Sequence, residues 1–143
     1  MIRLIYFVLL IMLSAYAHAG SVNCNQEQQI KAEAASDTSH DWDSLRRAYR
    51  QFKNCDDGGT AEGFSETVMK LLAEKWETTP RLFVLISHDK GFKEFVLNHI
   101  NATGDPSDIE KLKNNAQIHC PAPKNEMCQL IILRAELAIK DMN

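Results

Sequence analysis

The residues best suited to chemistry are histidines and a few acidic and hydroxyl side chains spread along the chain. His99 shares a helical face with apolar residues, which is typical of a buried histidine hydrogen-bonded to the backbone; the alternative is a pH-sensitive or catalytic group. His88 stands beside Asp89, but neighbouring residues at a helix start do not face one another. We therefore interpret His88 as a surface turn residue.

A serine nucleophile is poorly supported by the sequence. The segment 63–67, Gly-Phe-Ser-Glu-Thr, has the first glycine of the G-x-S-x-G elbow but not the second, and it falls inside an expected helix instead of a strand-to-helix turn. Neither a P-loop nor a G-x-G-x-x-G motif occurs in the chain. The sequence therefore predicts no catalytic residue and no cofactor, and the protein is expected not to be an enzyme.

The most unusual segment is residues 55–66, where a cysteine is followed by an acidic, glycine-rich turn and then by a strongly amphipathic stretch. Its order of oxygen ligands does not match a calcium-binding EF-hand loop, and we predict no metal site. One interpretation is a helix start whose acids complement the helix dipole. The other is a rigid negative projection that a basic or amide-rich cleft accepts. The candidate partner-binding residues are Asp56, Asp57, Gly58, Gly59 and Glu62.

Residues 1–19 predict the compartment. Arg3 precedes an apolar run, and small residues end the segment at Ala17-His18-Ala19, as in a cleaved secretory signal peptide. A membrane anchor is the alternative, but the apolar run is shorter than the roughly 20 residues that span a bilayer. We expect residues 20–143 to form one exported domain that is not held at the membrane.

Composition limits the classes of partner. The 143 residues include 16 basic and 19 acidic side chains, a net charge of -3, which provides no basic field for nucleic acid phosphates. With 45% hydrophobic residues the chain can bury a core, so a folded domain is expected.

The cysteines predict two disulfides, because an even number in an exported chain is typical of a crosslinked framework. The spacing favours a local pair, Cys120 with Cys128, since two prolines between them turn the chain back, and leaves Cys24 to pair with Cys55. A zinc site is the weaker alternative, because the usual closely spaced cysteine or histidine pairs do not occur.

The elements that must position these groups are helices. From Trp42 onward the apolar spacing is helical, without convincing period-two alternation. We predict an all-α fold, a compact bundle of five to six helices stapled by disulfides. Helices are expected over 41–54, 60–76 and 125–138 and after the start signals at Thr79-Pro80, Asp89 and Asp105-Pro106, with an ambiguous polar helix over 26–35.

Four features of the sequence belong together: the export signal, the four cysteines, the motif C-D-D-G-x-x-A-E-G-F-S-E at 55–66 and the C-P…C ending at 120–128. With them the chain resembles small periplasmic proteins, and in layout the Rap1a/Tai type of immunity protein. Members of that group are helical, often dimeric proteins that bind and block peptidoglycan amidase effectors delivered by type VI secretion. The resemblance implies a periplasmic, non-catalytic inhibitor with a toxin or cell-wall hydrolase as its protein partner, and it admits a homodimer.

Two rival hypotheses belong to other classes. A small secreted hydrolase would use His99 or His119 with a carboxylate, and it predicts a cleft in which the two approach within hydrogen-bond reach. A structural or chaperone-like periplasmic protein would instead expose an apolar groove lined by the last helix.

Overall fold

The computed structural model describes residues 24–121 and 125–143, and these form an all-α fold, as the sequence predicts. The described residues contain seven α-helices and no strand, which is one or two helices more than expected. The predicted signal peptide, residues 1–19, lies outside the described residues. The helices are α1 (Gln26–Asp37), α2 (Trp42–Phe52), α3 (Gly58–Glu74), α4 (Thr79–Ser87), α5 (Lys90–Asn98), α6 (Pro106–Ile118) and α7 (Glu126–Asp141).

Short polar side chains begin most of these helices. Each accepts a hydrogen bond from a backbone amide of the first turn, which would otherwise have no partner. At Asn25 and Asp41 the capping is reciprocal, because the side chain three residues later accepts a bond from the cap residue's own backbone amide. The other capping side chains are Asp57, Asp89, Asp105 and Asn125.

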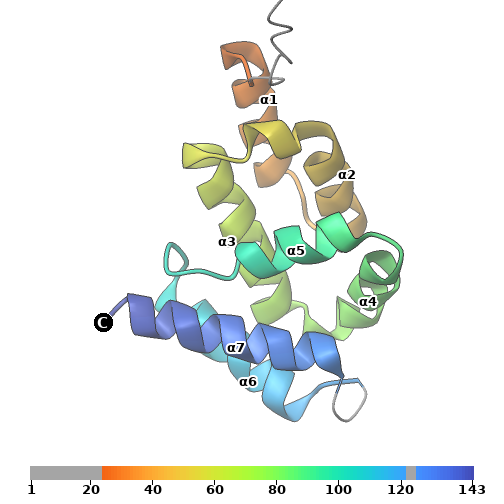
Figure 1. Ribbon diagram of the computed structural model, residues 1–143, viewed down its shortest axis with the longest axis vertical. Helices are drawn as coiled ribbons and strands as arrows, with labels where there is room; N and C mark the ends of the chain where they lie inside the picture. Colours follow the sequence, from red (N-terminus) through yellow and green to blue (C-terminus); the bar gives the residue numbers. More distant parts are fainter. Residues whose placement is uncertain (1–23, 122–124) are drawn as a thin grey trace, which may run out of the picture.

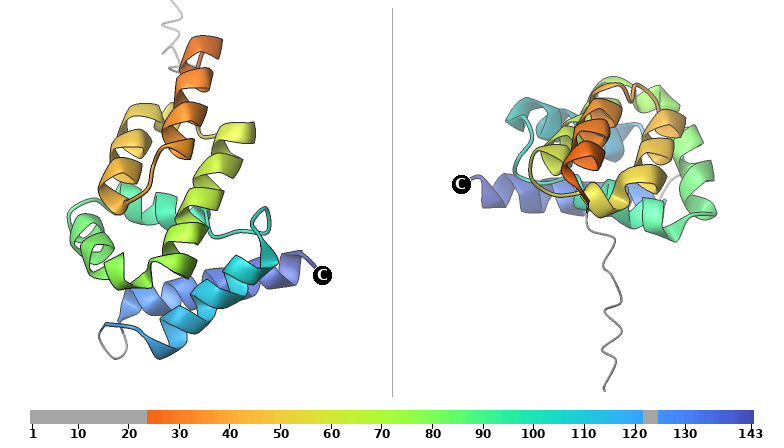
Figure 2. Two further views of the ribbon diagram at one scale, coloured as in Figure 1. Left: turned by 180° about the vertical axis from the view of Figure 1, so that it is seen from behind. Right: turned by 90° about the horizontal axis from the view of Figure 1, so that it is seen from above.

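The helices form two groups joined by α3 (Figure 1). Helices α1 and α2 pack together at one end of the molecule, and α1 lies along the first half of α3. Helices α6 and α7 pair at the other end, with α6 against α3 (Figure 2). Helix α5 crosses between the two groups and contacts both α2 and α7. At its C-terminal end, His99 contacts Asp56, which lies just before α3.

One core of large apolar side chains unites the two groups. Phe64, Val68 and Leu72 follow one another along the buried face of α3 and are fully shielded from solvent. Their spacing of four residues is that of the apolar face of an amphipathic helix, as expected for the helix over 60–76. The other fully buried large side chains are Trp42, Leu45, Met69, Leu82, Phe92, Val96, Ile109, Leu112 and Ile131.

Both predicted disulfides are confirmed. Cys24 is bonded to Cys55, which ties the start of α1 to the end of α2, and Cys120 is bonded to Cys128, which ties the end of α6 to the first turn of α7. Their sequence separations are 31 and 8 residues. The first crosslink holds the polar helix α1 against the rest of the domain, and this explains how a helix with few apolar residues is kept in place.

Several predicted boundaries shift by a few residues. The paired glycines Gly58 and Gly59 were expected to break the helical run before residue 60, but they form the first turn of α3. Thr78, not Thr79, is the residue before α4, so Pro80 occupies its second position. The ambiguous stretch 26–35 is the helix α1. Among the described residues, no helix combines the length and hydrophobicity needed to cross a bilayer.

Candidate functional site

The acidic turn, residues 55–59, connects α2 to α3 and is held at both ends. A short 3-10 helix, Lys53–Cys55, ends α2 and places Cys55 in the disulfide with Cys24. Two residues later Asp57 caps α3, where its Oδ1 accepts a bond from the Gly58 amide at 2.8 Å. Gly58 has a φ of 51°, a left-handed conformation that favours glycine over residues with a side chain.

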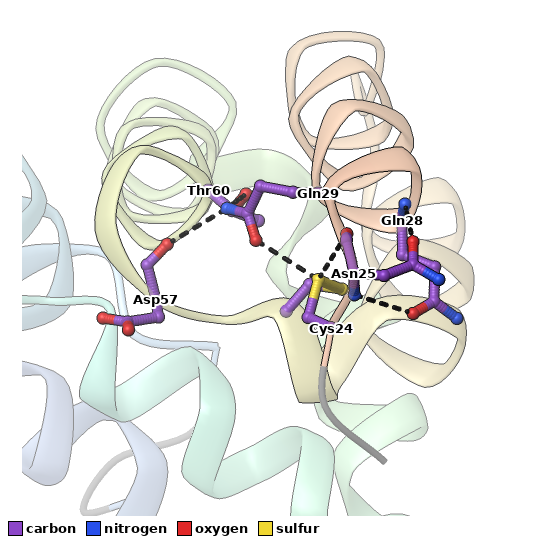
Figure 3. The surroundings of a disulfide bond; sticks show 7 residues. Cys24, Asn25, Gln28, Gln29, Asp57 and Thr60 are labelled. Atoms are coloured by element: carbon purple, nitrogen blue, oxygen red, sulfur yellow. Dashed lines mark hydrogen bonds between the residues drawn. A yellow bond between two sulfur atoms is a disulfide. The ribbon is translucent and has the colours of Figure 1, made fainter.

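Helix α1 supports the same turn from its other side (Figure 3). The side-chain amide of Gln29 donates to the Thr60 hydroxyl at 2.6 Å and lies 3.5 Å from the Asp57 carbonyl oxygen. Thr60 is fully buried. The turn is therefore fixed by a covalent bond and by hydrogen bonds from a second helix.

His99 lies at the end of α5, where its backbone amide donates to the Phe95 carbonyl at 3.1 Å. The ring packs against Phe95, with centroids 4.3 Å apart, and against Phe64 at 5.9 Å. Only 5% of the residue is exposed. The expectation of a buried histidine is confirmed, but the expected backbone partner for its side chain is wrong.

The partners of the His99 side chain are Asp56 and Ser65, which come from the acidic turn and from α3. Nε2 of His99 lies 3.0 Å from Asp56 Oδ2, and Nδ1 lies 2.9 Å from Ser65 Oγ. The Asn101 side-chain amide donates to the same Ser65 oxygen at 3.0 Å. We call these four residues the His99 chain: Asp56, His99, Ser65 and Asn101.

All donors and acceptors of the His99 chain match for a neutral imidazole. With a proton on Nε2, His99 donates to the Asp56 carboxylate, and Nδ1 is free to accept from the Ser65 hydroxyl. The Ser65 oxygen then accepts from Asn101, whose own carbonyl oxygen accepts from the Thr103 amide at 3.0 Å. The result is one continuous set of bonds that joins the acidic turn, α3, the end of α5 and the turn after it.

The order carboxylate, imidazole, hydroxyl is also that of a nucleophilic triad. In such a triad the histidine takes the proton of the serine hydroxyl as the oxygen attacks a carbonyl carbon. Here, however, Ser65 is only 1% exposed and lies in the middle of α3. The bond from Ser65 to His99 aligns the two groups for proton transfer. Because the Ser65 oxygen is buried and also accepts a bond from Asn101, a substrate has no access to it in this conformation.

Two grooves adjoin the acidic turn. A groove of about 380 Å³ runs beside the His99 chain and is also lined by Gly58, Glu62 and Thr103. A larger one, about 750 Å³, lies between α3 and the start of α6 and shares Glu62 with the first. The ionisable side chains lining the larger groove are Asp37, Glu62, Glu66, Asp105 and Asp108, with Lys70 as the only cation among the described lining residues.

Asp108, at the start of α6, lines the larger groove and is partly buried there. Partial burial, followed by the nearby Glu74 and Asp105 carboxylates, raises the pKa of Asp108 above its ordinary value. Lys70 does not offset this field freely, because it is paired with Glu66. We refer to the acidic turn together with the acidic residues of this groove as the acidic face.

The structure places the predicted partner-binding residues at these grooves, with one exception. Gly58 and Glu62 line the smaller groove together with Asp56, and Gly59 lines the larger one. Asp57 lines neither among the described grooves and serves as the cap of α3. Sequence reasoning missed the bonds of His99 to Asp56 and to Ser65, and the bond of Asn101 to Ser65, because the bonded residues lie in different elements.

Two other histidines, His88 and His119, stand apart from this site. His88 is exposed at the end of α4, in line with the surface turn expected for it. His119 is exposed at the end of α6, and its backbone carbonyl accepts from the Trp76 ring nitrogen at 2.8 Å. In the part of the chain that the structure describes, no three His, Cys, Asp or Glu side chains converge as a metal site.

No protein family, curated protein or solved structure matches this chain.

Proposed function

We propose that the protein is an exported inhibitor that binds a basic protein partner through its acidic face. The observation that carries the proposal is the fixation of the acidic turn. Cys55 is crosslinked, the Asp56 carboxylate is bound by His99, and Asp57 caps α3, so three consecutive residues are each tied to a different part of the fold.

A surface fixed in this way is suited to binding. An interface loop that is already ordered loses less conformational entropy when a partner docks, so more of the contact energy appears as affinity. The exposed carboxylate of Glu62 stands next to the turn and borders both grooves. Opposite charge on a partner would speed its encounter and fix its orientation.

The partner class follows from this chemistry and from the resemblance in layout to immunity proteins. A cell-wall hydrolase or toxin with arginine or lysine side chains around its substrate groove would present the complementary charge. Occupation of that groove by the acidic turn would block the hydrolase without any reaction in the inhibitor. A periplasmic location would bring the two proteins together.

The test uses charge reversal at matched sites. The exported protein, coupled to a resin, is exposed to periplasmic and secreted proteins, and any bound hydrolase is assayed for release of dye from labelled peptidoglycan. Glu62→Lys should abolish capture and inhibition. Glu77→Lys, an equal charge change on an exposed residue beyond the opposite end of α3, should preserve both.

The result that would overturn the proposal is equally specific. If the wild-type protein inhibits no captured hydrolase, or if Glu62→Lys and Glu77→Lys behave alike, the acidic face is not an inhibitory surface. Far-ultraviolet circular dichroism of both variants checks that neither reversal has altered the fold.

A second candidate function, a secreted serine hydrolase, is favoured by one observation: the bond order of the His99 chain. Substrate would have to enter from the 380 Å³ groove after Asn101 releases the Ser65 oxygen. A fluorophosphonate probe should then label the wild-type protein but not Ser65→Ala, whereas Ser107→Ala, a change at an exposed serine of α6, should label normally. Absence of labelling, with the exported protein folded, excludes this candidate and leaves the inhibitor.

A further inference from the structure

Helix α2 carries basic side chains on the side that points away from the core. The buried residues of this helix are Trp42, Leu45, Ala48 and Phe52. At 100° per residue, Arg47 and Arg50 fall on the opposite side of the helix, and both are exposed. Lys53 is exposed as well and lies in the 3-10 helix that follows α2. Three cations within seven residues therefore face solvent at this end of the molecule.

A fourth exposed cation, Lys90, is the first residue of α5. This end of α5 lies directly beside α2. The Asp89 carboxylate accepts a bond from Arg46 Nε at 3.0 Å, and a Cβ on Gly91 would lie only 2.4 Å from the Tyr49 hydroxyl oxygen. We call the four exposed cations the basic face: Arg47, Arg50, Lys53 and Lys90.

The charges of the basic face are not taken up by the fold. None of its four residues forms an ion pair with a described residue. The carboxylates near it are already engaged, since Asp43 is paired with Arg81, Asp89 is paired with Arg46, and Asp41 caps α2. A local positive field therefore remains, although the whole chain has a net charge of -3.

The shape of the basic face limits what it can bind. None of the described grooves is lined by its four residues, so the charges lie on the outer side of a helix and not in a hollow. A single small anion would contact one or two of them. A surface with many fixed negative charges could meet all four at once, and each contact would add to the binding.

We propose that the basic face binds the anionic headgroups of a phospholipid membrane. Each Lys or Arg close to such a surface raises the binding constant by about fivefold. The contact is peripheral, because α2 exposes no large apolar side chain that could insert between the lipids. The sequence predicts a domain that is not held at the membrane, and the basic face departs from that expectation, since a peripheral contact needs no anchor. The basic face shares no residue with the acidic face, so this inference does not rest on the proposed inhibition.

Cosedimentation of the exported protein with lipid vesicles tests the proposal. Vesicles of equal parts phosphatidylglycerol and phosphatidylcholine should bind the wild-type protein at low salt, and vesicles of phosphatidylcholine alone should not. Arg47→Gln and Arg50→Gln should each lower the binding constant about fivefold, and a variant with both changes and Lys53→Gln should lower it about a hundredfold. A rise in ionic strength from about 0.01 M to 0.15 M should weaken binding, because the screening length falls from about 30 Å to about 8 Å.

Lys140→Gln is the matched control. It removes an equal charge from an exposed residue in the last turn of α7, which ends far from α2 (Figure 1), and it should leave the binding constant unchanged. The melting temperature of each variant shows whether it is folded. The proposal is overturned if the anionic vesicles do not bind the wild-type protein, or if Lys140→Gln weakens binding as much as Arg50→Gln. Binding of poly-glutamate but not of vesicles would identify an acidic protein as the partner of the basic face and would likewise overturn it.

Discussion

Replacement of His99 by alanine is the most direct test of the packing around the acidic turn. The substitution removes a ring that contacts Phe95 and Phe64, and it breaks the bonds to Asp56 and Ser65. Each hydrogen bond contributes on the order of 1 kcal/mol net, and the cavity left by the ring adds a similar or larger cost. Solvent can reach part of Asp56, whose side chain is 26% exposed, so its carboxylate does not become an unpaired buried charge.

The expected loss is about 3 kcal/mol of unfolding free energy, or about 10 °C in melting temperature for a domain of this size. Thermal and urea unfolding at pH 7, followed by circular dichroism, measures it. His88→Ala is the matched control, because His88 is exposed at the end of α4 and should shift the melting temperature by less than about 2 °C.

A double-mutant cycle isolates the bond between His99 and Ser65. Ser65→Ala alone should cost about 1–2 kcal/mol, and the double variant should cost less than the two single changes together, since both remove the same bond. If His99→Ala melts within about 2 °C of the wild-type protein, or if the two changes are fully additive, the His99 chain does not stabilise the fold in the way described.

Three further substitution experiments follow from the fold. Removal of the longer disulfide by paired alanine substitutions should cost about 4 kcal/mol and removal of the shorter one about 2.5 kcal/mol on the loop-entropy model, so denaturant unfolding should rank the two variants in that order. Gly63→Ala should destabilise the protein despite its better helix propensity, because the new Cβ would lie 2.5 Å from Ser36 Oγ, and adding Ser36→Ala should recover part of the loss, since Ser36 Cβ remains at 3.3 Å. Burial of Asp89 opposes its ionisation, but the bonds from the Phe92 amide and the Arg46 guanidinium outweigh burial and lower the pKa of Asp89. The ionised carboxylate therefore stabilises the fold above about pH 4, and that stabilisation is lost as pH falls through the lowered pKa. Asp89→Asn should accordingly cost about 1–2 kcal/mol at pH 7, because the bonds to a charged carboxylate are lost, and the cost should shrink as pH falls through the lowered pKa, as measured by urea unfolding across the acid range.

Most helices could be predicted from signals that lie within each helix or one turn before it. Helix starts such as Asp89 and Asp105-Pro106 depend on residues within one turn, and the stripe Phe64, Val68, Leu72 carries its own period. The disulfide between Cys120 and Cys128 is local too. The prediction that the two glycines lie before the helix is wrong, because glycine favours turns but also tolerates the left-handed backbone that Gly58 adopts at the start of α3.

The His99 chain could not be predicted because its members are joined only by tertiary packing. Asp56, Ser65 and His99 each attract attention in the sequence, but 43 positions separate Asp56 from His99 and 34 separate Ser65 from it. Their approach depends on where α5 crosses α3, and an amphipathic pattern shows which face of a helix is buried without showing against which neighbour it packs. A histidine on an apolar face next to a phenylalanine one turn earlier indicates burial alone.

Catalysis and inhibition place opposite demands on the His99 chain. A nucleophile must meet its substrate, whereas a structural bond is strongest when water and other competitors are excluded. The Ser65 oxygen is bound by His99 and Asn101, and Asn101 is itself held by Thr103, so opening the site would break the bond to Ser65 and disturb the turn after α5. Each bond retained in the closed form stabilises the acidic turn through His99. The same closed geometry that denies a substrate access to Ser65 therefore strengthens the case for a surface whose role is to bind a partner without reacting with it.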